Sequence, residues 1–119
     1  MNGEKTSHMK QMWIKRPYFQ LIKSGKKTLE GRIGYPSMSR IKKGDDVLLQ
    51  TGGDEVKIKI IDVRKYESFR EALEKEEIAQ LLPDIKSENA LELYERIYPQ
   101  WKVEQYGGVL IFELRVMEK

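Results

Sequence analysis

The sequence contains no cysteine, and its single histidine, His8, lies in a polar segment at the start of the chain. A disulfide framework, a thiolate metal site and a cysteine nucleophile are therefore excluded. With no histidine in the expected folded part, histidine metal sites, Ser-His-Asp triads and Cys-His dyads are excluded there too. Any chemistry must come from lysine, carboxylate, tyrosine or hydroxyl side chains, and we expect neither a metal nor another cofactor.

Long apolar runs are also missing. No stretch approaches the eighteen or so residues that span a bilayer, and the first ten residues lack the apolar core of a secretory signal. We therefore expect no membrane partner and a cytoplasmic location. The triplet Ser-His-Met at 7–9 resembles a cloning-site remnant. Residues 1–10 are accordingly expected to form a flexible leader, of native or tag origin.

The remaining length fits one domain. A chain of 119 residues can bury roughly two-thirds of its unfolded surface, and no repeat or linker divides it. Residues 11–119 are therefore predicted to form a single domain, and we expect a monomer.

The net charge of +3 is too small to demand a polyanion partner. From residue 15 to 43, however, nine basic residues accompany a single acid, Glu30. This segment is the candidate for anion binding, and a solvated lysine-rich surface is the alternative.

Apolar residues recur with the spacing of short strands and helices along the whole chain. Pro17 suits the first turn of a helix, and Gly25 suits the position just after its end. Ser68, with Glu71 three residues on, resembles the capping box that begins a second helical segment. The predicted order is a strand at 13–14, a helix at 17–24, a strand at 27–33, a loop at 34–43, strands at 46–51 and 55–66, helical segments at 68–82 and 87–98, and a strand at 109–116.

This order predicts the fold class. A predicted turn at 52–54 joins two of the strands into a hairpin, and the strand at 55–66 is long enough to bend. Hairpin-connected strands with helices packed at one side are typical of α+β proteins. The sheet is therefore predicted to be curled and mainly antiparallel, with helices flanking it.

The densest polar segment is Gly-Lys-Lys-Thr-Leu-Glu-Gly-Arg at 25–32. Because Gly25 ends the helix tightly, Lys26 and Lys27 are expected to emerge at the junction between the helix and the next strand. A lysine that is desolvated at such a junction can serve as a base.

Glu30 and Arg32 stand two residues apart, so they share one face of the predicted strand, with Thr28 beside them. A carboxylate and a guanidinium on one rigid face present an acceptor and a forked donor to a base or a phosphate. The alternative interpretation is an exposed ion pair worth about 0–1 kcal/mol.

Aromatic residues give a second signal. Tyr35 lies in the basic loop, where it could stack on a base, a contact worth roughly 1–3 kcal/mol. Arg40 lies in the same loop and could contact a phosphate, or it is solvated charge. Tyr94 and Tyr98 recur at helical spacing, which is more typical of a packed core.

The spacing Gly-x-Lys-x-x-Glu-x-Arg at Gly25, Lys27, Glu30 and Arg32, followed by Lys-Gly-Asp at 43–45, resembles the ASCH domain family of the PUA-like superfamily. The small stand-alone archaeal and bacterial members are the most similar type. The resemblance implies a β-barrel-like sheet flanked by helices, a motif that lines a cleft, and a role in binding RNA or a nucleotide-like ligand. The candidate binding residues are Lys26, Lys27, Thr28, Glu30, Arg32, Tyr35 and Arg40.

Two other functions stay open. One ASCH branch contains amidohydrolases that remove acetyl from acetylcytidine with a lysine, a threonine and a glutamate. Lys27 matches that lysine, but Glu30 stands at the threonine position, so Lys27 and Glu30 are the catalytic candidates if the chain is an enzyme. A third carboxylate would come from the acidic residues between Glu67 and Glu77. The other function is a protein-interaction domain of the coactivator type, which predicts an exposed apolar patch.

Overall fold

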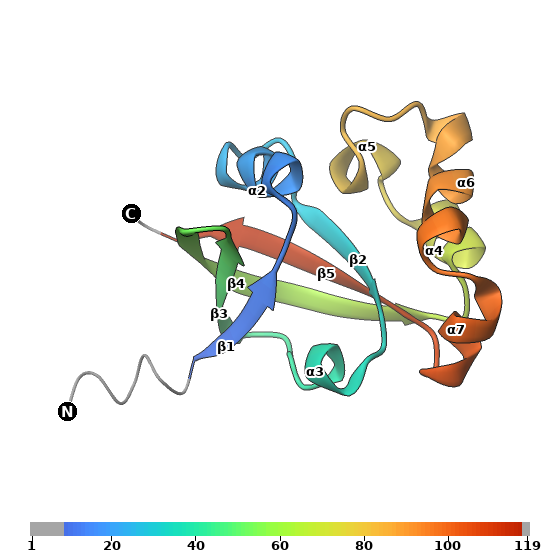
Figure 1. Ribbon diagram of the computed structural model, residues 1–119, viewed down its shortest axis with the longest axis horizontal. Helices are drawn as coiled ribbons and strands as arrows, with labels where there is room; N and C mark the ends of the chain where they lie inside the picture. The colour runs from blue at the N-terminus through green and yellow to red at the C-terminus, as the bar shows by residue number, and fades with distance from the viewer. Residues whose placement is uncertain (1–8, 118–119) are drawn as a thin grey trace.

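The computed structural model describes residues 9–117 (Figure 1). Residues 1–8 of the predicted leader lie outside the described residues. The first strand begins at Lys10, the last residue of the predicted leader. The elements, in chain order, are β1 (Lys10–Trp13), α2 (Arg16–Lys23), β2 (Leu29–Ile33), α3 (Pro36–Ser39), β3 (Asp46–Thr51), β4 (Asp54–Tyr66), α4 (Phe69–Lys75), α5 (Ile78–Leu81), α6 (Ser87–Ile97), α7 (Gln100–Gln105) and β5 (Val109–Val116).

The five strands form one sheet in the order β1-β3-β4-β5-β2. The β1–β3 pair is parallel, and the other three pairs are antiparallel. Strand β4 has 13 residues, and its register with β5 shifts between Ile60 and Asp62. Because such an irregularity bends a strand and increases its twist, β4 curls the sheet into a half-barrel. The predicted α+β class, with a curled and mainly antiparallel sheet, is confirmed.

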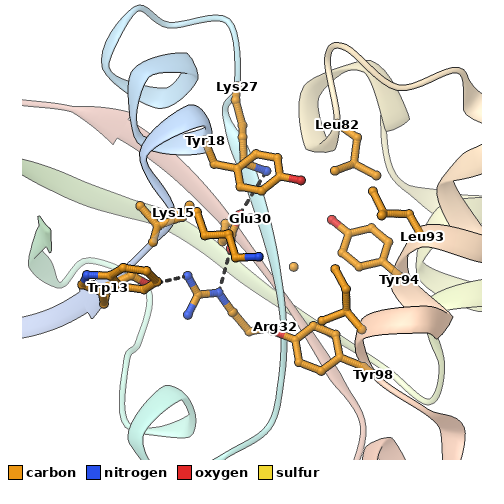
Figure 2. Close-up of a pocket in the computed structure, with 13 residues that line it drawn as sticks. Trp13, Lys15, Tyr18, Lys27, Glu30, Arg32, Leu82, Leu93, Tyr94 and Tyr98 are labelled. Carbon is orange, nitrogen blue, oxygen red and sulfur yellow. Dashed lines mark hydrogen bonds and ion pairs between the residues drawn. The ribbon is translucent and has the colours of Figure 1, made fainter. Parts of the chain in front are cut away.

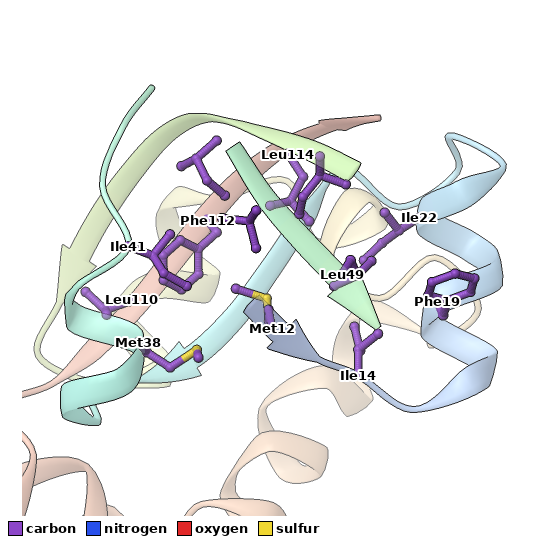
Figure 3. Packing of buried hydrophobic residues seen from close by; sticks show 13 residues of the cluster. Met12, Ile14, Phe19, Ile22, Met38, Ile41, Leu49, Leu110, Phe112 and Leu114 are labelled. Carbon is purple, nitrogen blue, oxygen red and sulfur yellow. The ribbon is translucent and has the colours of Figure 1, made fainter. Parts of the chain in front are cut away.

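Strand β5 is buried on both faces because each face of the sheet carries its own core. Leu110, Phe112 and Leu114 point into the curl, where α2 and α3 close the core (Figure 3). Val109 and Ile111 point to the opposite face, where they pack with residues of α4 to α7. The period of two along a strand produces this division. Strand β2 pairs only with β5, so it lies at a free edge of the sheet and between the two cores.

The end of α2 sets the direction of the chain before β2. Gly25 has a φ of +87°, which glycine adopts without the penalty that a Cβ atom brings. The Gly25 N–H donates to the Ile22 carbonyl at 3.0 Å, and the Lys26 N–H donates to the Leu21 carbonyl at 3.0 Å. These two bonds form a Schellman motif, which ends the helix as Gly25 predicted. The chain then reverses, leaving Lys26 exposed and Lys27 buried.

Two short helices differ from the sequence expectation. The segment at 34–43, predicted as a loop, contains α3, and α7 follows Pro99, where only a helix end was predicted. In both cases the proline marks a helix start, since Pro36 is the first residue of α3 and Pro99 is the N-cap of α7. Within residues 9–117, no helix has the length and apolar character needed to cross a membrane.

Candidate functional site

A cavity of about 230 Å³ opens between the free edge of β2, the junction of β1 with α2, and helices α5 and α6 (Figure 2). Its walls combine a charged group from β2 with aromatic and aliphatic side chains from the helices. The lining residues are Trp13, Ile14, Lys15, Tyr18, Lys27, Glu30, Gly31, Arg32, Leu82, Leu93, Tyr94, Ile97 and Tyr98.

Lys27 is 2% exposed, which is rare for a lysine. Its Nζ donates to the Leu29 carbonyl at 2.6 Å and to the Leu81 carbonyl, and it lies 3.0 Å from Glu30 Oε1. An ammonium has three protons, so all of its donors are occupied. The ammonium also lies 5.6 Å from the centre of the Tyr18 ring, within the range of a cation–π contact. Lys27 is thus held as a buried cation that joins β2 to α5.

Glu30 is 8% exposed and lies between two cations. Its Oε2 accepts from Arg32 Nε at 2.7 Å, on the opposite oxygen from Lys27. Burial acts to raise the pKa of the Glu30 carboxyl, but the charges of Lys27 and Arg32 outweigh it, so the pKa lies below its usual value. Glu30 is therefore a fixed carboxylate at neutral pH, and the interpretation as an exposed ion pair does not hold.

Arg32 completes the group that we call the ion triad: Lys27, Glu30 and Arg32. Its Nη2 donates to the Trp13 carbonyl at 2.8 Å, so the guanidinium bridges β2 and β1, the two edge strands of the sheet. A guanidinium has five N–H donors, and Arg32 uses two of them in these bonds to oxygen. Arg32 Nη1 also makes a weak contact with Met38 Sδ at 3.8 Å, and the other protons can serve a ligand.

Two tyrosines of the helical layer face the triad across the cavity (Figure 2). The Tyr94 and Tyr98 rings stack on Phe69 with centroids at 4.4 and 5.5 Å. Burial raises the pKa of Tyr94 well above its usual value and raises the pKa of Tyr98 as well. Both hydroxyls therefore stay protonated at neutral pH and can donate hydrogen bonds. The sequence placed these tyrosines in the core, and each is both a core residue and a wall of the cavity.

The mouth of the cavity carries exposed apolar and basic side chains. Trp13 is 60% exposed and Ile97 is 49% exposed. Lys15 is also exposed, and Figure 2 shows its amino group directed into the cavity. An entering planar group would meet an aromatic face and a cation at this position.

The sequence model of the ASCH domain matches residues 12–116. This chain belongs to the ASCH domain family. The crystal structure of hypothetical protein PH0355 is similar at 35% identity and a TM-score of 0.79, covering 90% of this chain and 97% of that one. The solution structure of protein PF0455 from Pyrococcus furiosus is similar at 34% identity and a TM-score of 0.72, covering 92% and 97%. Among curated proteins, none matches the chain. The predicted family and the PUA-like fold are confirmed.

The ASCH motif does not bring all of its predicted residues to the cavity. The Thr28 hydroxyl donates to Gln80 Oε1 at 2.8 Å, and Thr28 lines a separate depression. Lys26 is exposed, since the Schellman motif turns it away from Lys27. Within the described residues, no serine or threonine lines the cavity.

The loop residues of the ASCH domain also lie elsewhere. Tyr35 packs edge-on against Tyr106 with ring centroids 4.6 Å apart, and the Lys102 amino group lies 5.7 Å from the Tyr35 ring centre. Arg40 is exposed and is absent from the cavity wall. Their predicted roles in ligand binding stay predictions, separate from the cavity.

The acidic segment between Glu67 and Glu77 contributes no residue to the cavity wall. Glu76, one of its members, accepts two hydrogen bonds from Arg64 at 2.6 and 2.8 Å and one from the Tyr66 hydroxyl at 2.5 Å. Arg64 also contacts Asp62 and Glu113. The Arg64 and Glu76 side chains thus find their hydrogen-bond partners within this network, which holds α4 against β4.

Several wall residues were missed by sequence analysis. Trp13, Lys15 and Tyr18 flank Pro17, and no motif distinguishes them from ordinary residues of a strand and a helix. Gly31 stands between the two charged motif residues, which is the one signal that could have identified it. A glycine inside a strand often marks a close approach of another group to the backbone.

Proposed function

We propose that this ASCH-domain protein binds RNA or a nucleotide by taking one base into the cavity beside the ion triad. One observation carries the proposal: the ion triad lines the same small cavity as three tyrosines, Tyr18, Tyr94 and Tyr98. Proteins that recognise unpaired bases place them against aromatic rings and bond their polar edges. A volume of about 230 Å³ is below the usual 300–1,000 Å³ of pockets for drug-sized ligands. It suits one base with its sugar and phosphate outside.

The charge of the cavity favours an anionic ligand. Lys15, Lys27 and Arg32 line it with Glu30 as the single anion among the described residues. Lys15 is the cation at the mouth, where the phosphate of a bound nucleotide would lie. Contacts with phosphate weaken as salt increases, so affinity for nucleotides should fall with ionic strength more than affinity for nucleosides.

Fluorescence of Trp13 offers a direct test. The chain has two tryptophans, and Trp101→Phe leaves Trp13, at the cavity mouth, as the single reporter. Titration of this variant with the four ribonucleosides, their 5′-monophosphates and a short single-stranded RNA should change the Trp13 emission in a saturable way. Absence of binding for all of them, checked by calorimetry at millimolar concentration, would contradict the proposal.

A matched pair of variants locates the binding site. Lys15→Ala and Lys26→Ala each remove one exposed lysine, but only Lys15 lines the cavity. We expect Lys15→Ala to weaken binding of a monophosphate several-fold, because an exposed charge pair is worth up to about 1 kcal/mol. Lys26→Ala should leave the affinity unchanged. The opposite ranking would place the site on the basic surface instead of in the cavity.

Binding without hydrolysis agrees best with the cavity. Amide hydrolysis would need a base or a nucleophile. Lys27 donates to two carbonyls and to Glu30, and the two Glu30 oxygens are held by Lys27 and Arg32, while Thr28 lies outside the wall. Release of cytidine from acetylcytidine would overturn this preference. The third function, protein interaction, would use exposed apolar residues such as Trp101, which is 64% exposed on α7. The monomeric state and the cytoplasmic location stay predictions.

A further inference from the structure

The free edge of β2 contributes main-chain groups to the cavity. The Leu114 N–H donates to the Thr28 carbonyl at 2.8 Å, and the Gly34 N–H donates to the Gly108 carbonyl at 3.0 Å. In an antiparallel ladder, hydrogen-bonded and non-hydrogen-bonded residue pairs alternate. These two bonds assign the even-numbered residues of β2 to the hydrogen-bonded pairs with β5. Leu29, Gly31 and Ile33 therefore direct their N–H and C=O groups to the free edge.

Two of these three residues are already engaged through their carbonyl groups. The Leu29 carbonyl accepts from Lys27 Nζ at 2.6 Å, and the Ile33 carbonyl accepts from the Tyr35 N–H at 2.8 Å. Gly31 lies between them and lines the cavity. In the part of the chain that the structure describes, no hydrogen bond outside the ladder uses its N–H or C=O. The cavity wall thus presents one donor and one acceptor from a single extended residue.

From this geometry, and resting on the function proposed above, we propose that the Gly31 main chain binds the lactam edge of a uracil-type base. The Gly31 N–H donates to a ring carbonyl, and the adjacent ring N–H donates to the Gly31 carbonyl. Gly31 is buried, so a bound ring has to take the place of water as the partner of both main-chain groups. A ring that lacks the N–H would leave the Gly31 carbonyl without a donor.

A planar ring fits this edge better than a peptide strand. Strand addition uses main-chain groups of several alternating residues along an edge. Here the carbonyls of both neighbours, Leu29 and Ile33, are occupied, so only the pair on Gly31 has both groups available. A single lactam needs only one such pair, and it needs no length of free edge beyond it.

Because residue 31 has no side chain, the Tyr94 hydroxyl can lie close to the Gly31 main chain as a further donor. A Cβ atom on Gly31 would lie 3.2 Å from the Tyr94 hydroxyl and 3.4 Å from Ile111 Cδ1. The Tyr94 hydroxyl therefore lies close against the Gly31 backbone and remains a donor at neutral pH. Uracil carries a carbonyl on each side of its ring N–H. One carbonyl can accept from the Gly31 N–H and the other from Tyr94, whereas a base with fewer carbonyls leaves a donor without a partner.

The test compares uridine with 3-methyluridine, which keeps both carbonyls but has no ring N–H. On the full chain carrying Trp101→Phe, we expect 3-methyluridine to bind about 10- to 100-fold more weakly, the cost of one buried acceptor left unpaired. The Gly31 amide should shift downfield in two-dimensional NMR spectra with uridine, and its hydrogen exchange should slow. The Gly25 amide is the internal control, since its N–H is bonded to the Ile22 carbonyl and lies outside the cavity wall.

The outcomes separate this inference from the function on which it rests. If no nucleoside binds, the proposed function fails. If nucleosides change the Trp13 emission but the Gly31 amide does not move, the function stands and the Gly31 contact is refuted. Equal affinity for uridine and 3-methyluridine, or a preference for a base other than uracil, would also refute the contact.

Discussion

Replacing Glu30 by glutamine tests whether the ion triad is a buried charge cluster. Glu30→Gln keeps the shape of the side chain and removes its charge. Lys27 then remains 2% exposed as a cation, with two carbonyls and an amide in place of a carboxylate. The glutamine amide can turn one oxygen to Lys27, but its NH₂ group then faces the Arg32 Nε–H, so a donor meets a donor.

The expected cost follows from this burial. Removing one partner of a buried ion pair destabilises a protein by about 3–5 kcal/mol, because the other charge is left uncompensated. Glutamine retains one acceptor, so we expect the low end, about 3 kcal/mol. A domain of this size loses roughly 4 °C of melting temperature per kcal/mol. Glu30→Gln should therefore melt roughly 12 °C below the parent chain.

Glu92→Gln is the matched control. It makes the same chemical change in an exposed pair, Glu92 with Arg96 on α6, where the side chains are 3.3 Å apart. Exposed pairs with this spacing contribute only a few tenths of a kcal/mol, so its melting temperature should hardly change. Calorimetry or urea denaturation of the three proteins supplies the comparison. Equal destabilisation by the two substitutions would refute the description of the triad as a buried cluster.

Acid provides a second, independent measure. The pKa of Glu30 is lower in the folded protein than in the unfolded chain, so its ionisation stabilises the fold fully above the usual carboxyl range. That contribution is lost as the pH falls through the lowered pKa. The stability difference between the parent chain and Glu30→Gln should therefore be largest near pH 7 and shrink toward pH 3. Other carboxyls titrate in both proteins, so a constant difference would show that the Glu30 charge does not matter.

Two substitutions test the local geometry in the same way. Gly31→Ala should lower the free energy of unfolding by about 1–3 kcal/mol because its Cβ would crowd the Tyr94 hydroxyl and Ile111. Tyr94→Phe removes that hydroxyl, so the double variant should recover part of the loss. Strictly additive losses in urea denaturation would contradict the contact. Ser68→Ala should cost about 1 kcal/mol by removing the cap bond to the Glu71 N–H, which is 3.1 Å long. An unchanged urea midpoint would show that the cap contributes nothing.

Local chemistry made much of the fold predictable. Gly25 predicted the end of α2, and the observed Schellman bonds of the Gly25 and Lys26 N–H groups confirm it. Alternation predicted β5 at its observed bounds, and its two apolar faces match the two cores. Ser68 was predicted as a cap, and its side chain accepts from the Glu71 N–H. Each of these signals acts over a few residues, so the sequence alone carries it.

The walls of the cavity could not be predicted because they join distant segments. Trp13 and Tyr94 belong to segments about eighty residues apart, and they line one hollow because β2 lies between them at the sheet edge. Periodicity identifies which face of α6 is apolar, but not that one part of that face borders a cavity. For the same reason the sequence could not show that the Tyr35 ring packs against Tyr106, and the stacking of Tyr35 on a base stays a prediction.

The spacing of the ASCH motif explains how the charged residues surround the position proposed for the ligand. An edge strand normally exposes a row of unpaired main-chain groups, which is a liability for association. Here Lys27 and Arg32 hold that edge against α5 and β1, respectively. Glu30 balances both cations, and its i, i+2 spacing from Arg32 leaves Gly31 between them, facing the helical layer. A ligand would then contact groups with unused hydrogen-bonding capacity, chiefly Gly31 and the tyrosine hydroxyls. Loss of the triad should consequently affect folding and affinity together, whereas removing a single ring N–H from the ligand should affect affinity alone.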